Sequence, residues 1–191
     1  MIELYLVRHG ETDWNKKLLC QGRIDNHLND NGKIQAHNLG KKIKDKGLSF
    51  DVFMTSPLIR AQETLSIIKD ELNINLPTII NEGFIERDFG ELETQDVALV
   101  RDVIDSNKES YYPGCERNSS LEERVYCAAI DLLKEYDNKR ILLVSHSHAI
   151  KGLLSYIDSN KYCFSTKLLN MNMTHLSISK DKVEVKELHV F

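Results

Sequence analysis

Long hydrophobic runs are missing from this sequence of 191 residues. No apolar stretch approaches the ~18 residues that a membrane-spanning helix needs, so we expect no membrane partner. The first residues carry Glu3 and Arg8 around a short apolar run, which is unlike a secretory signal. A basic excess is missing too, because the formal net charge is -4 and the pI is near 6.0. This charge gives no support to a nucleic-acid-binding surface.

Closely spaced cysteine pairs are also absent. The four cysteines are Cys20, Cys115, Cys127 and Cys163, and none forms a Cys-x-x-Cys motif. Such scattering is typical of reduced thiols in a cytosolic protein and argues against a disulfide framework or a structural zinc site. We therefore expect a cytoplasmic protein. The length suits one well-buried domain, so residues 1–191 are predicted to form a single domain.

Apolar runs bounded by turn residues predict strands at 2–7, 51–56, 77–80 and 140–145, with a hairpin at 171–179 and 183–190. Amphipathic or capped stretches predict helices from 29–32 to 47, and at 58–72, 95–107, 120–136 and 148–158. Residues 9–28 are polar and irregular, which predicts a long loop that lines a site. Strands that alternate with helices favour an α/β fold.

Polar side chains follow directly on the first predicted strand, where Arg8, His9 and Gly10 stand in succession. The carboxyl end of a central strand is where open α/β sheets place their chemistry. An imidazole beside a fixed positive charge suits a histidine that meets an anion. Gly10 allows the backbone to turn sharply and to approach a ligand closely.

Two other strands end in the same manner. The run at 140–145 leads into His146, and the run at 51–56 leads through Pro57 to Arg60 in the first turn of a helix. The partial positive charge at that helix N-terminus would add to the charge of Arg60. These junctions together predict an anion site without a metal, because arginines and histidines supply several charge-assisted donors to a phosphoryl group.

The run Arg8-His9-Gly10-Glu11-Thr12, followed by Trp14-Asn15 and Gln21-Gly22, resembles the signature of the histidine phosphatase superfamily. This superfamily includes the cofactor-dependent phosphoglycerate mutases and many small phosphatases. Further matching blocks are 56–64, the pair Glu86 and Gly90, and 145–146. The resemblance implies a phosphoglycerate mutase-like α/β fold, in which a mixed, mainly parallel central sheet carries helices on both faces.

The resemblance also implies roles for individual residues. His9 would be the nucleophile that becomes phosphohistidine, and Arg8, Arg60 and His146 would hold the phosphoryl oxygens. Glu86 would protonate the leaving group and then activate water. Residues expected to contact the substrate are Asn15, Gln21, Gly22, Arg87 and Ser147, the last of which stands where the family normally has glycine. No metal or other cofactor is implied. His146 and His148 alone are weak evidence for zinc, and His148 has no assigned role.

Three functions remain open on these grounds. We favour a phosphatase acting on a small phosphorylated metabolite, because the short separation of Glu86 and His146 leaves little room for the covering segment of the mutases. A mutase is the alternative, since Arg87 follows Glu86 as it does in mutases, where it meets a substrate carboxylate. A non-catalytic binder is the least favoured, because His9, Arg60, Glu86 and His146 are all present. A homodimer through the C-terminal hairpin or a sheet edge is possible.

Overall fold

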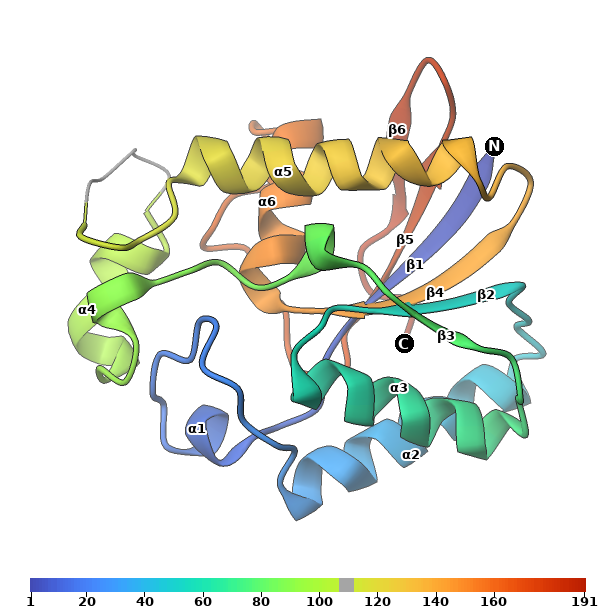
Figure 1. The fold of residues 1–191 in the computed structure, drawn as a ribbon, viewed down its shortest axis with the longest axis horizontal. Coiled ribbons are helices and arrows are strands. Elements are labelled where there is room, and N and C mark those ends of the chain that lie inside the picture. The colour runs from blue at the N-terminus through green and yellow to red at the C-terminus, as the bar shows by residue number, and fades with distance from the viewer. Residues whose placement is uncertain (107–111) are drawn as a thin grey trace.

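The computed structural model describes residues 1–106 and 112–191 (Figure 1). The strands are β1 (Ile2–Arg8), β2 (Val52–Thr55), β3 (Thr78–Ile80), β4 (Arg140–Ser145), β5 (Met173–Ile178) and β6 (Val183–Glu187). The α-helices are α1 (Asp13–Lys16), α2 (Asp30–Asp45), α3 (Ile59–Leu72), α4 (Val97–Ile104), α5 (Asn118–Asp131) and α6 (Ser147–Ile157). Short 3-10 turns are η1 (Glu82–Phe84), η2 (Gly90–Leu92) and η3 (Leu132–Lys134).

The strands form one sheet in the order β3-β2-β4-β1-β5-β6. The first four of these are parallel to one another, and β5 and β6 are antiparallel at one edge. Val144 pairs with both Val7 and Thr55, and Arg8 pairs with Ser145. Because of this register, β1, β2 and β4 end level with one another, at the side of the molecule where α1 and α4 lie (Figure 1).

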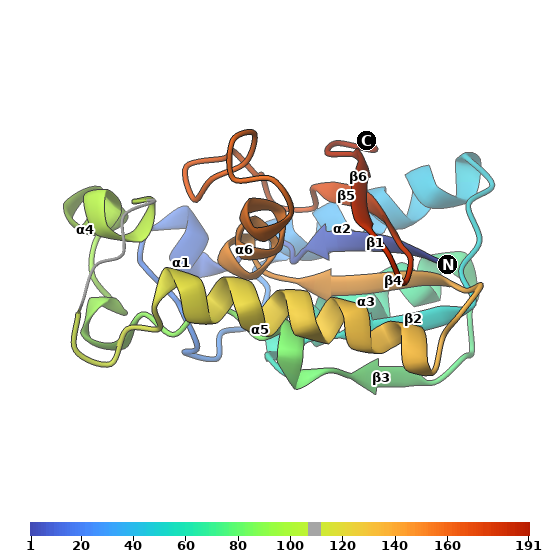
Figure 2. The ribbon, with the colours of Figure 1, turned by 90° about the horizontal axis from the view of Figure 1, so that it is seen from above.

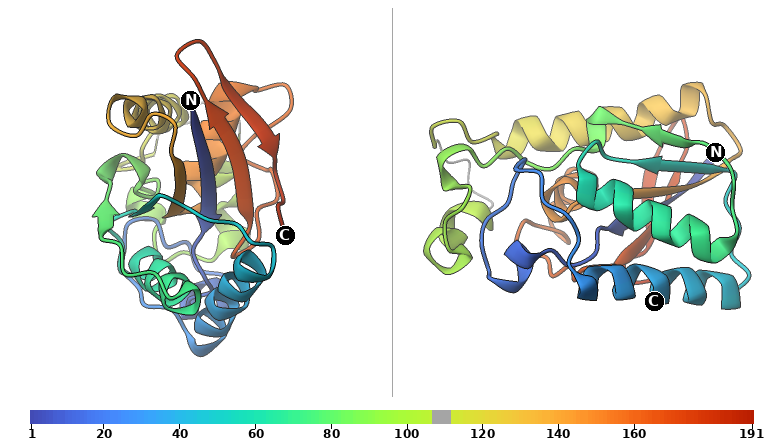
Figure 3. Two further views of the ribbon diagram at one scale, coloured as in Figure 1. Left: turned by 90° about the vertical axis from the view of Figure 1, so that its right-hand side faces the viewer. Right: turned by 60° about the horizontal axis from the view of Figure 1, so that its bottom comes forward.

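The two faces of the sheet carry separate hydrophobic cores. Leu4 and Leu6 pack in a cluster with residues of α5 and α6, whereas Tyr5 and Val7 pack with residues of α2 and α3. Side chains alternate between the faces of a strand, so the almost unbroken apolar run of β1 serves both cores. Figures 1 and 3 show α2 and α3 together, apart from α5 and α6. The predicted mixed sheet with helices on both faces is confirmed.

A third, smaller cluster lies away from both faces of the sheet. It joins Cys20, Phe89, Leu92, Val100 and Ile104, and so connects α4 to η2 and to the loop after α1. Figures 1 and 2 both show α4 set apart from the strands, beyond their carboxyl ends. This end of the molecule therefore has its own minor core.

The structure differs from the sequence predictions at several element ends. The predicted loop 9–28 contains α1, whose cap Thr12 accepts from the backbone N–H of Asn15 while the Asn15 side chain accepts from that of Thr12. This reciprocal cap holds a helix too short to show periodicity. The end of the predicted helix 95–107 and residue 111 of the following loop lie outside the described residues. Within the described parts of the chain, no helix is both long and apolar enough to span a membrane.

Candidate active site

A cavity of about 210 Å³ opens at the carboxyl ends of β1, β2 and β4. Its walls combine residues from the end of β1, the loop after it, the segment between η1 and η2, and the helices α3, α4 and α6. They are Arg8, His9, Asn15, Leu19, Cys20, Gln21, Gly22, Arg60, Glu86, Phe89, Val97, Ile104, Asp105, Ser147, His148 and Lys151. Larger hollows of 470 and 540 Å³ lie elsewhere, and neither is lined by a predicted catalytic residue. The smaller cavity is therefore the candidate site.

His9 lies directly after β1 and is 3% exposed. Its Nδ1 lies 2.7 Å from the carbonyl oxygen of Gly10, to which it donates as an N–H. This bond leaves the lone pair on Nε2, which accepts the Nε–H of Arg60 at 3.3 Å. Burial lowers the pKa of His9 well below its ordinary value, and the charges of Arg60 and Arg8 lower it further. The imidazole is therefore neutral, with its basic nitrogen beside a cation.

Arg60 lies in the first turn of α3 and is 1% exposed. Its Nη1 donates to the carbonyl oxygen of Ile24 at 2.9 Å, and its Nη2 to that of Gly22 at 2.7 Å. Burial lowers the pKa of Arg60 to about 10, so the guanidinium keeps its charge at neutral pH. This fork joins His9 to the loop 20–24 in a geometry that a lysine could not reproduce.

His146 follows β4 and is completely buried behind His9, with the two ring centroids 5.1 Å apart. Its Nε2 is hydrogen-bonded to Oγ of Ser56, which follows β2, at 2.5 Å. Its Nδ1 is buried and has no partner in the described part of the chain. Burial lowers the pKa of His146 well below its ordinary value, with Arg60 as the next cause. The ring is neutral, and its Nδ1 is free for a further hydrogen bond.

Glu86 stands at the N-terminus of α6, although it comes from the segment after η1. Its Oε1 accepts from the backbone N–H groups of Arg87 at 2.9 Å and Ala149 at 3.0 Å, and its Oε2 accepts from that of His148 at 3.3 Å. The free N–H groups at a helix N-terminus are ready donors to such oxygen acceptors. The carboxyl group is thereby fixed in the wall of the cavity that His9 also lines.

The loop that carries Gln21 and Gly22 is held over the cavity by Glu93. The Glu93 carboxylate accepts from the backbone N–H groups of Arg23 at 2.8 Å and Ile24 at 3.2 Å. Gly22 adopts a φ of +53°, and a Cβ there would lie 1.9 Å from Glu93 Oε1. A glycine is therefore required where this loop crosses the acidic side chain.

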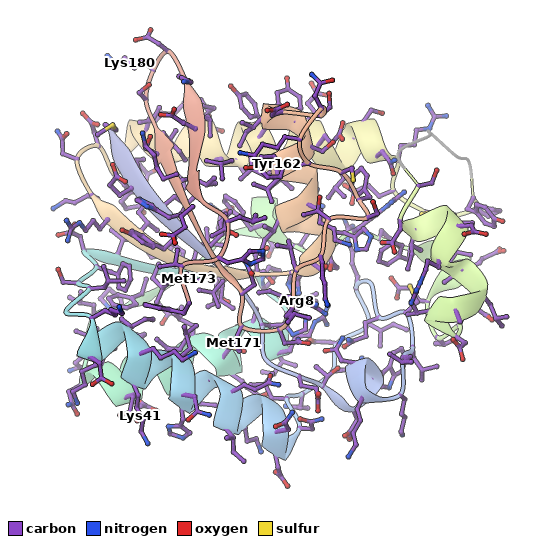
Figure 4. The ribbon with its side chains drawn as sticks, turned by 180° about the vertical axis from the view of Figure 1, so that it is seen from behind. Arg8, Lys41, Tyr162, Met171, Met173 and Lys180 are labelled. Atoms are coloured by element: carbon purple, nitrogen blue, oxygen red, sulfur yellow. The ribbon has the colours of Figure 1, made fainter. Side chains whose placement is uncertain are left out.

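The structure brings most of the predicted site residues to one cavity. Eight line it: Arg8, His9, Asn15, Gln21, Gly22, Arg60, Glu86 and Ser147. Arg8 also lies against the segment before β5 (Figure 4), where its Nη1 donates to the carbonyl oxygen of Leu168 at 2.5 Å. His146 stands behind the lining, next to His9.

Arg87 is not part of the cavity lining. Its Nε donates to the carbonyl oxygen of Glu116 at 2.9 Å, and its guanidinium lies 5.4 and 5.6 Å from the ring centroids of Phe89 and Phe164. Its Nη1 is buried without a partner among the described residues. Arg87 therefore stands next to the lining without being part of it, with its backbone N–H on Glu86, and its contact with a substrate stays a prediction.

Eight further residues of the lining had no assigned role in the sequence, among them Asp105, His148 and Lys151. His148 and Lys151 stand three positions apart on α6, a spacing that places two side chains on one helix face and is the signal that could have found them. His148 Nε2 donates to the carbonyl oxygen of Ile104 at 3.0 Å. His146 and His148 thus turn their Nε2 atoms to different partners, and no group of three metal-ligating side chains occurs among the described residues.

Cys20 is the thiol of the lining and a second type of nucleophile to compare with His9. Burial raises the pKa of its thiol to about 12, so the thiol stays protonated at neutral pH. Only a thiolate is a strong nucleophile. His9 is thus the better candidate.

Comparisons with known proteins agree with this geometry. The chain is 34% identical to the uncharacterized phosphatase PhoE of Bacillus subtilis, over 100% of this chain and 95% of that protein. It is 37% identical to the 2,3-bisphosphoglycerate-dependent phosphoglycerate mutase of Parvibaculum lavamentivorans, over 81% of this chain and 79% of the mutase.

Solved structures of phosphatases are also similar to this chain. Phosphoserine phosphatase from Entamoeba histolytica, in complex with 3-phosphoglyceric acid, is similar with a TM-score of 0.81 and 28% identity, covering 100% of this chain and 98% of that one. The mycobacterial glucosyl-3-phosphoglycerate phosphatase shares the fold, with a TM-score of 0.86 at 18% identity over 99% of both chains. The family profile described as histidine phosphatase superfamily (branch 1) matches residues 4–190, and the chain belongs to that superfamily.

Proposed function

We propose that this protein hydrolyses small phosphomonoesters through a phosphohistidine formed on Nε2 of His9. The observation that carries the proposal is the state of this ring. Its Nδ1–H is held by the Gly10 carbonyl oxygen, so the tautomer leaves a lone pair on Nε2 inside the cavity. A neutral imidazole oriented by a hydrogen bond on its other nitrogen is an activated nucleophile.

The reaction takes two displacement steps. In the first, Nε2 of His9 attacks phosphorus, the bond to the ester oxygen breaks, and that oxygen takes a proton from the carboxyl group of Glu86. In the second, the Glu86 carboxylate takes a proton from water, whose oxygen attacks the phosphohistidine and releases phosphate with a neutral His9. One group acts as an acid and then as a base, as microscopic reversibility requires.

The remaining site residues stabilise charge or position the substrate. Arg8 and Arg60 supply positive charge at the phosphoryl oxygens, and the Nδ1 of His146 is an unused polar atom behind them. Donors fixed before the reaction stabilise the charge that develops in the transition state. Asn15, Gln21, Gly22 and Ser147 complete the lining around the ester group.

Hydrolysis is favoured over mutase chemistry by the extent of similarity. The chain matches the phosphatase PhoE along 95% of that protein, but the mutase of Parvibaculum along only 79%. A mutase must protect its phosphohistidine from water for long enough to return the phosphoryl group. Transfer remains the second candidate because mutases are among the relatives.

The test compares the purified wild type with His9→Ala in phosphate release from a panel of monophosphates, with a chelator present. We expect wild-type turnover to survive the chelator, and the variant to lose at least about 10⁴-fold in kcat, as nucleophile deletions do. Wild type should also trap an acid-labile phosphoryl label that the variant lacks. His37→Ala, which changes an exposed ring on α2, is the matched control and should keep full activity.

Other outcomes would change the function. Transfer between the positions of phosphoglycerate with little free phosphate would establish a mutase. Silence of the wild type across the whole panel would establish a phospho-ligand or protein binder. Turnover that persists in His9→Ala would refute the phosphohistidine route.

A further inference from the structure

A partly buried ion pair lies in the cavity wall and takes no part in the proposed chemistry. Lys151 projects from α6, and Asp105 caps the C-terminus of α4. Lys151 Nζ lies 3.3 Å from Asp105 Oδ1. The Lys151 side chain is 9% exposed and that of Asp105 is 29% exposed. Both residues line the same 210 Å³ cavity as His9 and Glu86.

The place of Lys151 on α6 fixes where its ammonium can act. It stands one turn after Ser147, which also lines the cavity. Long side chains on a helix extend toward its N-terminus, and the N-terminus of α6 holds Glu86. The ammonium therefore reaches back toward the reacting groups from the far wall.

Lys151 has donor capacity to spare. An ammonium has three N–H donors, and Asp105 is the one hydrogen-bond acceptor of Lys151 found in the described ranges, at a long 3.3 Å. Burial lowers the pKa of Lys151, while Asp105 counters that effect by raising it. The pair is thus a cation and an anion that both face a cavity and are weakly satisfied by each other.

Among the residues that the structure describes, no neighbouring side chain supplies a positive charge in place of Lys151 in this part of the cavity lining. Burial lowers the pKa of His148 well below its ordinary value, so its ring carries no charge at neutral pH. Arg87 is turned to the Glu116 carbonyl oxygen and is outside the lining. The other cations of the lining, Arg8 and Arg60, stand close to His9, where the proposed function needs them for the phosphoryl group.

We infer that Lys151 and Asp105 bind the part of the substrate that is not phosphate, and that they select a phosphorylated amino acid. Lys151 takes the substrate carboxylate, and Asp105 takes the adjacent ammonium. A substrate that has a carboxylate but no ammonium would place that carboxylate at Lys151 and also next to the Asp105 carboxylate. Two like charges this close to each other repel. A zwitterion satisfies both groups. This inference rests on the proposed phosphatase function.

The cavity size agrees with such a substrate. Sites for drug-sized ligands have volumes of about 300 to 1,000 Å³, whereas this one has about 210 Å³. The protein from Entamoeba that is named for phosphoserine, and that was solved with 3-phosphoglyceric acid, has the same fold at 28% identity. Both of those compounds are small phosphomonoesters with a carboxylate, and only phosphoserine has the ammonium as well.

The experiment measures kcat/KM for O-phosphoserine, 3-phosphoglycerate and para-nitrophenyl phosphate. In Lys151→Met, the ratio of phosphoserine to the aryl phosphate should fall by about tenfold or more, as for loss of a charge-assisted contact. In Asp105→Asn, the ratio of phosphoserine to 3-phosphoglycerate should fall by about tenfold, because the anionic competitor is no longer repelled. Lys151→Arg, which keeps the charge, should recover part of the loss.

The matched control is Lys134→Met, which breaks an exposed Lys–Asp pair with Asp131 at 2.7 Å, far from the cavity. All its ratios should equal those of wild type. An equal loss on all three substrates in Lys151→Met would overturn the inference, since it would show a purely structural link between α4 and α6. An unchanged ratio in Asp105→Asn would overturn the zwitterion selection. A wild type silent even on para-nitrophenyl phosphate would instead refute the proposed phosphatase.

Discussion

The two ends of the cavity are built in different ways. At the phosphate end, His9, His146 and Arg60 stand at the ends of β1 and β4 and at the start of α3, on elements that belong to the two large cores. At the far end, Asp105 and Lys151 meet across a contact between α4 and α6. There α4 is supported by the third, minor core.

This difference in support matches a difference in task, since one end holds the reacting groups and the other the groups that select the substrate. Groups that must act on a reacting atom need positions fixed to a fraction of an ångström, which strand ends inside a packed core provide. Groups that choose among substrates can stand on an element with fewer supporting contacts. The local stability of a region follows the apolar surface that it buries. We therefore expect substitutions at the two ends to fail in different measurements.

After the loss of the nucleophile in His9→Ala, the largest effect should come from Glu86→Gln at the phosphate end. The change keeps the shape of the side chain but removes the proton that the leaving oxygen needs, so kcat for an alkyl phosphate should fall by about 10³-fold. The loss should be much smaller for para-nitrophenyl phosphate, whose leaving group needs no proton. Steady-state kinetics on both esters measures the difference.

Glu91→Gln provides the control, because this exposed carboxylate lies five positions further along the chain. It should leave both esters unaffected. A Glu86→Gln variant that loses the same factor on the alkyl and the aryl ester would show that Glu86 positions α6 and does not transfer a proton.

The sequence indicated the phosphate end far better than the far end. Apolar runs at 2–7 and 140–145 predict buried parallel strands, and the residues after such strands must meet at one edge. That local logic locates His9 and His146 without any knowledge of packing. Asn15 and Gln21 rest on the resemblance alone, because their positions depend on a loop whose course the capped α1 and Glu93 determine.

The far end lacks such a local signal. Asp105 and Lys151 are distant in the chain, and only the packing of α4 near α6 brings them together. Arg87 shows the converse problem. Its neighbour Glu86 is held in the cavity wall by N–H groups of α6, whereas the Arg87 side chain is drawn away by the Glu116 carbonyl oxygen and two aromatic rings. Adjacent residues in an irregular segment need not line the same cavity.

The free energy of unfolding should depend on pH in the same way through the histidines at both ends of the cavity. Burial lowers the pKa of His9 and His146 at the phosphate end and of His148 at the far end. Their ordinary value in an unfolded chain is about 6.5. Below that pH the unfolded chain binds protons that the folded chain does not, so the free energy of unfolding falls as the pH falls. The maximum slope is about 1.4 kcal/mol per pH unit for each histidine.

Urea unfolding between pH 7 and pH 5 measures this slope in wild type, His9→Gln and His148→Gln. In each variant, the free energy of unfolding should depend less steeply on pH, by the contribution of one histidine. The free energy of unfolding at pH 7 should change by less than the difference seen at pH 5. If His148→Gln leaves the slope unchanged, the far wall exposes this ring to water in solution, and the two ends differ in burial as well as in support.

The smallest effect concerns stability, and it compares the large core between the sheet and helices α2 and α3 with the minor core around α4. The same change, valine to alanine, is made in each core. Val144→Ala in β4 should lower the global free energy of unfolding by about 2 kcal/mol, because its side chain is completely enclosed between α2, α3 and the sheet. Val100→Ala in the minor core should cost only about 1 kcal/mol. That cost should appear as faster hydrogen exchange of the α4 amides with little change in Tm, because a weakly supported helix opens without the rest of the fold.

Because α4 carries Asp105, KM for a phosphorylated amino acid should rise with this opening of α4, while kcat for para-nitrophenyl phosphate should stay unchanged. If Val100→Ala lowers the global stability as much as Val144→Ala, then α4 unfolds only with the sheet, and the division of the cavity into a rigid and a weakly supported end is wrong.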